Sequence, residues 1–272
     1  MATKDALVRS IVRMRRGPYF YDCYLNPRVS ASDVYLMCYP RSGSTWVRCL
    51  LTSYAHDTEV TPDLVYESVP SIYRVDLTVQ PHTDREIGVF RSHSKYVSIP
   101  AKIIYLVRDG RDAVLSWYWF RYHAEGPDGF ARTVSSRDFF FLDKKFGPWH
   151  EHVLGWLQGL ETWPADRYMI LRYEDLVADP ERHLSAIVEF VGLPFDLERV
   201  ERAVAWNGKS ALAEFDRRDP GALAFQGVTK QRWRDVLSDE DLARYEAVAG
   251  QALIRAGYPL CSTRPLAPCP TS

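Results

Sequence analysis

Apolar runs and helical periods alternate along this chain, as they do in an α/β fold. An apolar run at residues 34–39 stops at Pro40 and resumes at Val47, so the pattern predicts a strand, a short loop and a helix. A second run at 103–107 is continuous and rich in β-branched residues, which is typical of a parallel strand buried on both faces. A helical period follows it from Arg111.

The other expected elements are shorter or less regular. Strands are predicted within 87–96 and at the start of 167–176, and residues 141–156 predict a loop that enters a helix. Two further helices are marked by their capping residues, one at 180–191 and the last at 238–256.

Length and composition favour one domain. The 272 residues are 46% hydrophobic, which supplies a large core, and no stretch rich in proline, glycine and serine divides them. We therefore expect a single α/β domain over 1–272, with a central, mainly parallel sheet flanked by helices. Residues 1–31 are expected to form an N-terminal helix and lead-in, and 257–272 a proline-rich tail.

Charge and hydropathy exclude several classes of protein. The formal net charge of −1 gives no overall basic field for duplex nucleic acid, so no nucleic-acid partner is expected. No window approaches the ~18 to 20 apolar residues that span a bilayer, and no secretory signal opens the chain, which favours the cytoplasm. An amphipathic helix is expected at the start of the chain, and its arginines either form a solvated face or make a peripheral contact with a membrane. The four arginines are Arg9, Arg13, Arg15 and Arg16.

The cysteines indicate neither disulfides nor a metal site. Their number is odd, they form no Cys-x-x-Cys pair, and they do not cluster with histidine. We expect reduced thiols and no bound metal. The five positions are Cys23, Cys38, Cys49, Cys261 and Cys269.

The loop after the first strand has the composition of an anion site. Gly43 allows a tight turn, Arg41 supplies positive charge, and the amides that open the next helix point at a bound anion. Hydroxyl groups come from Ser42, Ser44 and Thr45. The Gly-x-x-x-x-Gly-Lys-Ser/Thr spacing of nucleoside-triphosphate loops is absent, so the loop is expected to hold a different anion.

A second candidate anion site follows the strand at 103–107. Arg108 lies at the carboxyl end of that strand, where ligands bind in α/β sheets, and Ser116 lies on the next helix. A guanidinium and a hydroxyl together suit a phosphate dianion. The alternative is that Arg108 pairs with Asp112 and Ser116 merely packs within its helix.

These two blocks together resemble the sulfotransferases that use 3′-phosphoadenosine 5′-phosphosulfate (PAPS). Residues 39–46 read Tyr-Pro-Arg-Ser-Gly-Ser-Thr-Trp, where the family usually has Tyr-Pro-Lys-Ser-Gly-Thr-Thr-Trp. Residues 102–120 are similar to the family's 3′-phosphate site. The resemblance implies PAPS as donor and adenosine 3′,5′-bisphosphate (PAP) as product. It also implies a nucleotide site made by the loop from Arg41 to Trp46 together with Arg108, Ser116 and Tyr173.

The same resemblance implies the catalytic groups. His93 leaves a strand at the sheet edge shared with Arg41, and it matches the histidine that removes the acceptor's proton. Arg91 would assist at the sulfuryl oxygens, and Arg41 would stabilise the departing 5′-phosphate. Arg41 is the main departure from the family, which usually has a mobile lysine at this position.

Near the carboxyl end the likeness weakens. Residues 225–234 retain Gly227 and Trp233 but lack the family's Arg-Lys pair and contain one extra residue. Lys230 and Arg232 are the expected substitutes at the 3′-phosphate, and Arg217 or Arg218 are alternatives.

The acceptor is left open by the sequence. The aromatic segments 117–122 and 139–141 either shape an acceptor pocket or belong to the core. We expect sulfuryl transfer to a hydroxyl of a small molecule, a glycolipid or a sugar. The alternatives are a non-catalytic PAPS- or PAP-binding protein and a nucleotide-dependent kinase.

Overall fold

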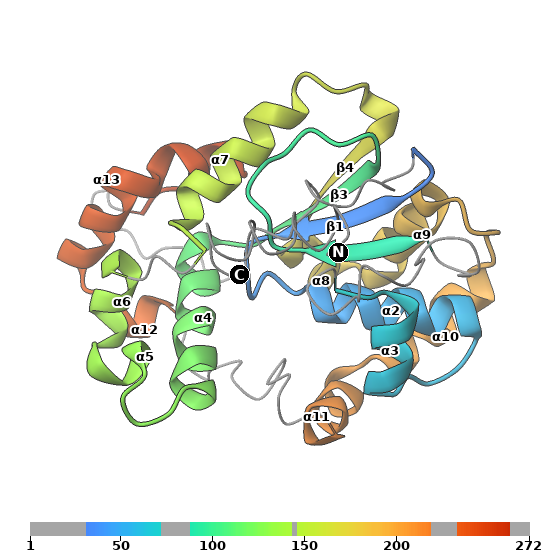
Figure 1. Cartoon of the computed structure of the whole chain (residues 1–272), viewed down its shortest axis with the longest axis horizontal. Helices are drawn as coiled ribbons and strands as arrows, with labels where there is room; N and C mark the ends of the chain where they lie inside the picture. The colour runs from blue at the N-terminus through green and yellow to red at the C-terminus, as the bar shows by residue number, and fades with distance from the viewer. Residues whose placement is uncertain (1–30, 72–87, 143–145, 219–232, 262–272) are drawn as a thin grey trace, which may run out of the picture.

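The computed structural model describes residues 31–71, 88–142, 146–218 and 233–261. Four parallel strands form its central sheet, in the order β2-β1-β3-β4 (Figure 1). The parallel sheet flanked by helices confirms the predicted fold class. The strands are β1 (Val34–Cys38), β2 (Val89–Ser92), β3 (Lys102–Val107) and β4 (Tyr168–Arg172).

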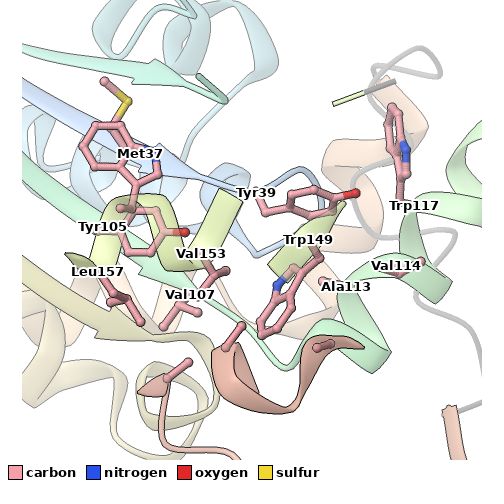
Figure 2. Close-up of a cluster of buried hydrophobic side chains, with 14 of the residues drawn as sticks. Met37, Tyr39, Tyr105, Val107, Ala113, Val114, Trp117, Trp149, Val153 and Leu157 are labelled. Atoms are coloured by element: carbon pink, nitrogen blue, oxygen red, sulfur yellow. The ribbon is translucent and has the colours of Figure 1, made fainter. Parts of the chain in front are cut away.

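The two central strands are apolar because helices cover both of their faces. Along β1, Tyr35 and Met37 belong to one core cluster, whereas Leu36 and Cys38 belong to the other. Successive side chains of a strand point to opposite faces, so each buried face needs its own apolar set. Figure 2 shows the first cluster, in which Tyr105 of β3 lies beside side chains of α7.

Two helical layers cover the sheet (Figure 1). The layer that packs on Leu36 and Cys38 contains α2 (Ser44–His56), α8 (Tyr173–Ala178), α9 (Pro180–Val191) and α10 (Leu197–Trp206). The opposite layer contains α4 (Gly110–Ala124), α5 (Phe130–Thr133), α6 (Ser136–Leu142), α7 (Trp149–Leu160) and α13 (Asp239–Arg255). The remaining elements are α3 (Pro62–Ser68), the 3-10 helix η3 (Ala165–Arg167), α11 (Lys209–Arg218) and α12 (Trp233–Val236).

The capping signals located the helix ends well. Helix α9 begins at Pro180 with Asp179 as its cap and ends before Gly192, which has a φ of 89°. Ser238 forms a capping box with Asp241 at the start of α13, and that helix ends one residue before the expected position. The predicted opening helix, with its arginines, lies outside the described residues, as does the tail from 262 onward.

No helix in these described ranges combines the length and apolar character that crossing a membrane requires. In the same ranges, no cluster of histidine, cysteine and acidic side chains could hold a metal ion. Cys38, Cys49 and Cys261 form no disulfide among the described residues, and the other two cysteines lie outside those residues.

Candidate active site

Three neighbouring strands end at one edge of the sheet, and each delivers a predicted site residue there. β1 leads into the loop with Arg41, β2 is followed directly by His93, and β3 is followed directly by Arg108. Because the strands are parallel and adjacent, their carboxyl ends lie together, which is where α/β sheets bind ligands.

The loop between β1 and α2 is shaped as an anion site. Arg41 and Gly43 have φ values of 68° and 99°, and α2 begins at the next residue, Ser44, without a side-chain cap. Trp46 N donates to the main-chain oxygen of Gly43 at 3.0 Å, so the amides at the very start of the helix, those of Ser44 and Thr45, are the ones available to an anion. Ser42 Oγ is buried and has no hydrogen-bond partner among the described residues, which fits a ligand oxygen.

Two guanidinium groups lie side by side at this loop. Arg108 Nη1 donates to the main-chain oxygen of Arg41 at 3.0 Å, and Arg41 Nε donates to Ser116 Oγ at 3.2 Å. Burial and the charge of Arg108 lower the pKa of Arg41 to about 10, so the Arg41 guanidinium remains cationic near neutral pH. The described residues show no ion pair between Arg108 and Asp112, and Ser116 takes its hydrogen bond from Arg41.

Tyr173 joins the loop to Arg108. The Arg108 guanidinium lies 4.7 Å from the centre of the Tyr173 ring, and Trp46 meets the ring edge-on at 6.3 Å. A Cβ atom at Gly43 would lie 2.4 Å from this ring, so glycine is required both for its φ and for the close approach. Trp46 is held by a hydrogen bond from its Nε1 to the main-chain oxygen of Asn207.

His93 is oriented by the end of β1. Its Nδ1 lies 2.8 Å from the main-chain oxygen of Cys38. A carbonyl oxygen only accepts, so Nδ1 carries the proton and Nε2 carries the lone pair. Burial, together with the charge of Arg91, holds the pKa of His93 well below 6.5, and the ring is therefore neutral near neutral pH.

Arg91 acts on this region through its charge. The charge lowers the pKa of both His93 and Arg41, so the guanidinium lies within electrostatic range of each. Its Nη1 donates to Ser71 Oγ at 3.3 Å, and its buried Nε has no partner among the described residues.

A row of aromatic rings connects His93 to Arg41. Phe146 meets His93 edge-on at 5.8 Å, and Trp117 lies 5.2 Å from Phe146. Phe120 stacks on Trp117 at 5.3 Å, and the Arg41 guanidinium lies 5.1 Å from the Phe120 ring. We call Phe146, Trp117 and Phe120 the aromatic wall.

The sequence interpretation left the role of these aromatic residues undecided and did not single out Phe146. Phe146 lies in the stretch 141–156, which the sequence predicted only as a loop that enters a helix. Tyr118 and Phe139 belong to the buried core instead.

Of the remaining predicted residues, two lie in the described part of the chain and three lie outside it. The Ser44 side chain hydrogen-bonds the Cys38 thiol, and Thr45 is half-buried on the first turn of α2. Gly227, Lys230 and Arg232 lie outside the described residues.

Arg217 and Arg218 lie in the last turn of α11. Both form ion pairs with Glu214.

Comparisons with known proteins agree on one kind of domain. Residues 31–208 match the family model described as a sulfotransferase domain. A flavonol sulfotransferase-like protein of Flaveria bidentis is 28% identical over 201 residues, which cover 66% of this chain and 63% of that protein. Cytosolic sulfotransferase 17 of Arabidopsis thaliana is 26% identical over 268 residues, which cover 84% and 76%. The match to the Flaveria protein thus spans less than two thirds of that relative.

Solved structures share the fold. Retinol dehydratase in complex with androsterone and inactive cofactor PAP superposes with a TM-score of 0.62 at 17% identity, covering 87% of this chain and 85% of that one. Mouse sulfotransferase SULT7A1, complexed with PAP, gives 0.58 at 19% identity, covering 84% and 88%.

Proposed function

This chain belongs to the sulfotransferase family, and we propose from that premise that it moves the sulfuryl group of PAPS to a hydroxyl group of an acceptor. The observation that carries the proposal is the convergence of a neutral, oriented imidazole and two cationic guanidiniums at one sheet edge. Such an edge offers a base for the acceptor and positive charge for the donor.

The residues around the phosphate loop fit the anionic end of PAPS. We assign the 5′-phosphosulfate to Arg41, the unpartnered Ser42 hydroxyl and the first amides of α2. We assign the 3′-phosphate to Arg108 and Ser116. Ser116 accepts a hydrogen bond from Arg41, so its own O–H can still donate to a phosphate oxygen.

When bound, PAPS supplies an activated sulfuryl group with a phosphate as its leaving group. His93 Nε2 would accept the proton of the acceptor hydroxyl, because Nδ1 is already protonated and bound to Cys38. Arg41 stays charged despite its lowered pKa and would stabilise the negative charge that forms on the 5′-phosphate. Arg91 would add positive charge beside the sulfuryl oxygens.

The aromatic wall supports an acceptor with an apolar or aromatic body. Its rings run from His93 to Arg41, and apolar rings of this kind pack against flat or hydrocarbon surfaces. We therefore propose a small-molecule alcohol or phenol first, with glycolipid and sugar hydroxyls as the other acceptors to screen. The cytoplasm is the proposed location, which the similarity to a cytosolic sulfotransferase of Arabidopsis supports.

The test is a screen of acceptors with sulfur-radiolabelled PAPS, followed by His93→Ala. We expect His93→Ala to lower turnover by about 10² to 10⁴ and to leave PAP affinity unchanged, because a general base acts on the chemical step. The exposed His123 is the matched control, and His123→Ala should retain full turnover.

Three outcomes would contradict the proposal. Wild-type turnover in His93→Ala would exclude this base. Binding of PAP without transfer to any acceptor would favour the non-catalytic binder, and stabilisation by ATP with Mg²⁺ instead of PAP would favour the kinase.

A further inference from the structure

The main chain that carries His93 is held by α7. His93 follows Ser92, the last residue of β2, so it lies beyond the sheet. His152 Nε2 lies 3.3 Å from the main-chain oxygen of His93, and Trp156 Nε1 donates to the main-chain oxygen of Ser94 at 2.8 Å. Both α7 side chains are 0% exposed and lie one helical turn apart.

Tyr105 of β3 supports His152 from the sheet. Its hydroxyl lies 3.1 Å from His152 Nδ1, and its ring stacks on Trp156 at 5.6 Å. The main-chain oxygen of His93 only accepts, so His152 Nε2 must carry the proton and Nδ1 must accept from Tyr105. Figure 2 shows Tyr105 beside Val153 and Leu157 of the same helix.

Both nitrogens of His152 are therefore used within the protein. Burial also lowers the pKa of His152 to about 4, so the ring is neutral near neutral pH and keeps the one tautomer that satisfies both partners. A buried ring with both nitrogens engaged cannot take a proton from an acceptor.

We propose that His152 and Trp156, supported by Tyr105, are positioning residues for the catalytic base. They hold the main chain of His93 and Ser94 in the position from which His93 Nδ1 reaches the Cys38 carbonyl, and from which Nε2 would meet the acceptor hydroxyl. The inference rests on the proposed role of His93. Displacement of a catalytic group by about 1 Å can cost about a hundredfold in rate. Loss of either hydrogen bond to the carbonyls of His93 and Ser94 should therefore lower the rate measurably.

The first experiment removes each donor and keeps an aromatic ring. His152→Phe and Trp156→Phe should each lower kcat by roughly tenfold to a hundredfold, while the acceptor KM and the PAP Kd stay within about twofold. His152→Gln can donate to the His93 carbonyl again and should recover most of the loss.

Trp163→Phe is the matched control. It removes an indole hydrogen bond to Tyr96 at 3.2 Å but leaves the His93–Ser94 carbonyls paired, and kcat should not change. A thermal shift with PAP shows that each variant folds. If His152→Phe does not fold, Trp156→Phe and His152→Gln carry the test.

A second readout does not need turnover. In nitrogen-15 spectra of histidine side chains, the His93 signals are those that disappear in His93→Ala. We expect a neutral ring protonated at Nδ1 in the wild type, and a mixture of tautomers in His152→Phe and Trp156→Phe.

Wild-type kcat together with an unchanged His93 spectrum in these variants would overturn the inference and leave the proposed function intact. Full turnover in His93→Ala would instead exclude His93 as the base, whereas absence of transfer to any acceptor would overturn the proposed function. In either case the spectra would still decide whether α7 positions this ring.

Discussion

At the scale of single residues, burial and charge act in the same direction on His93. Burial disfavours the imidazolium, and the nearby Arg91 cation disfavours it further, whereas the hydrogen bond to Cys38 opposes both. The net result is a pKa well below 6.5. The base form is thus available across the neutral range, although a base with a lowered pKa is intrinsically weaker.

This shift predicts the position of the acid limb in the pH profile. A protonated imidazole cannot accept a proton, so kcat falls as the pH drops through the pKa of His93. We expect kcat to stay level from neutral pH to below 6.5, and to fall only at lower pH. Arg91→Met removes a cation that repels the His93 imidazolium. The pKa of His93 should therefore rise, and the acid limb of the profile should move to higher pH.

Steady-state rates between about pH 4.5 and 8 would measure the limb. Arg202→Met, which removes a cation that pairs with Asp57, should leave it in place. A wild-type limb above 6.5 would contradict the assignment of His93 as the titrating base.

A second prediction at this scale concerns the 3′-phosphate. Arg108→Ala and Ser116→Ala should each weaken PAP binding by ~1.5 to 3 kcal/mol, or roughly tenfold to a hundredfold, because each removes a charge-assisted hydrogen bond. Calorimetry measures the affinity. Unchanged affinity in both variants would remove this assignment.

At the scale of elements, the turn from β1 into α2 depends on one close contact. Tyr173 begins α8, far from the loop in sequence, yet its ring fills the space that a side chain at residue 43 would need. The same ring lies against the guanidinium of Arg108. A change in the loop is therefore transmitted to the second anion-binding residue.

Gly43→Ala tests this coupling. The new Cβ would lie 2.4 Å from the Tyr173 ring at a φ of 99°, so we expect a loss of roughly 1 to 3 kcal/mol in stability and weaker PAP binding. Gly88→Ala is the control, because nothing lies within 4 Å of its added Cβ. Chemical denaturation and calorimetry compare the two, and equal behaviour would show that the contact is unimportant.

At the scale of the whole molecule, buried ion pairs attach the C-terminal segment to the turn after β3. Arg111 contacts Asp109 at 2.7 Å and Glu246 of α13 at 2.8 Å. Glu174 accepts from the amide of Asp109 at 3.1 Å and from the Tyr258 hydroxyl at 2.6 Å. The residue that precedes this turn is Arg108, so the anion site depends on contacts from distant parts of the chain.

Arg111→Met should therefore destabilise the protein strongly. It leaves two carboxylates without their buried partner, which typically costs about 3 to 5 kcal/mol. The exposed pair of Arg218 and Glu214 is the control, and Arg218→Met should cost less than about 1 kcal/mol. Urea denaturation measures the loss of stability in both variants. Similar losses would contradict the proposed importance of burial.

The sequence by itself determined the elements whose signals are local. The apolar run at 103–107 identified the central strand, and Asp179 with Pro180 identified the start of α9. The strand ends then placed His93 and Arg108 at one edge, because parallel strands share the direction of their carboxyl ends. These signals extend over a few residues, so they survive without knowledge of the packing.

Only the tertiary structure decided which side chains meet. Ser116 was expected to face Arg108, but its hydrogen bond comes from Arg41. The contacts of His93 with Cys38 and with His152 join residues 55 and 59 positions apart. Such contacts depend on strand order and on how α7 packs over β3, and periodicity along the chain carries no information about either. The fold class and the candidate residues could therefore be predicted, whereas the hydrogen bonds that orient them could not.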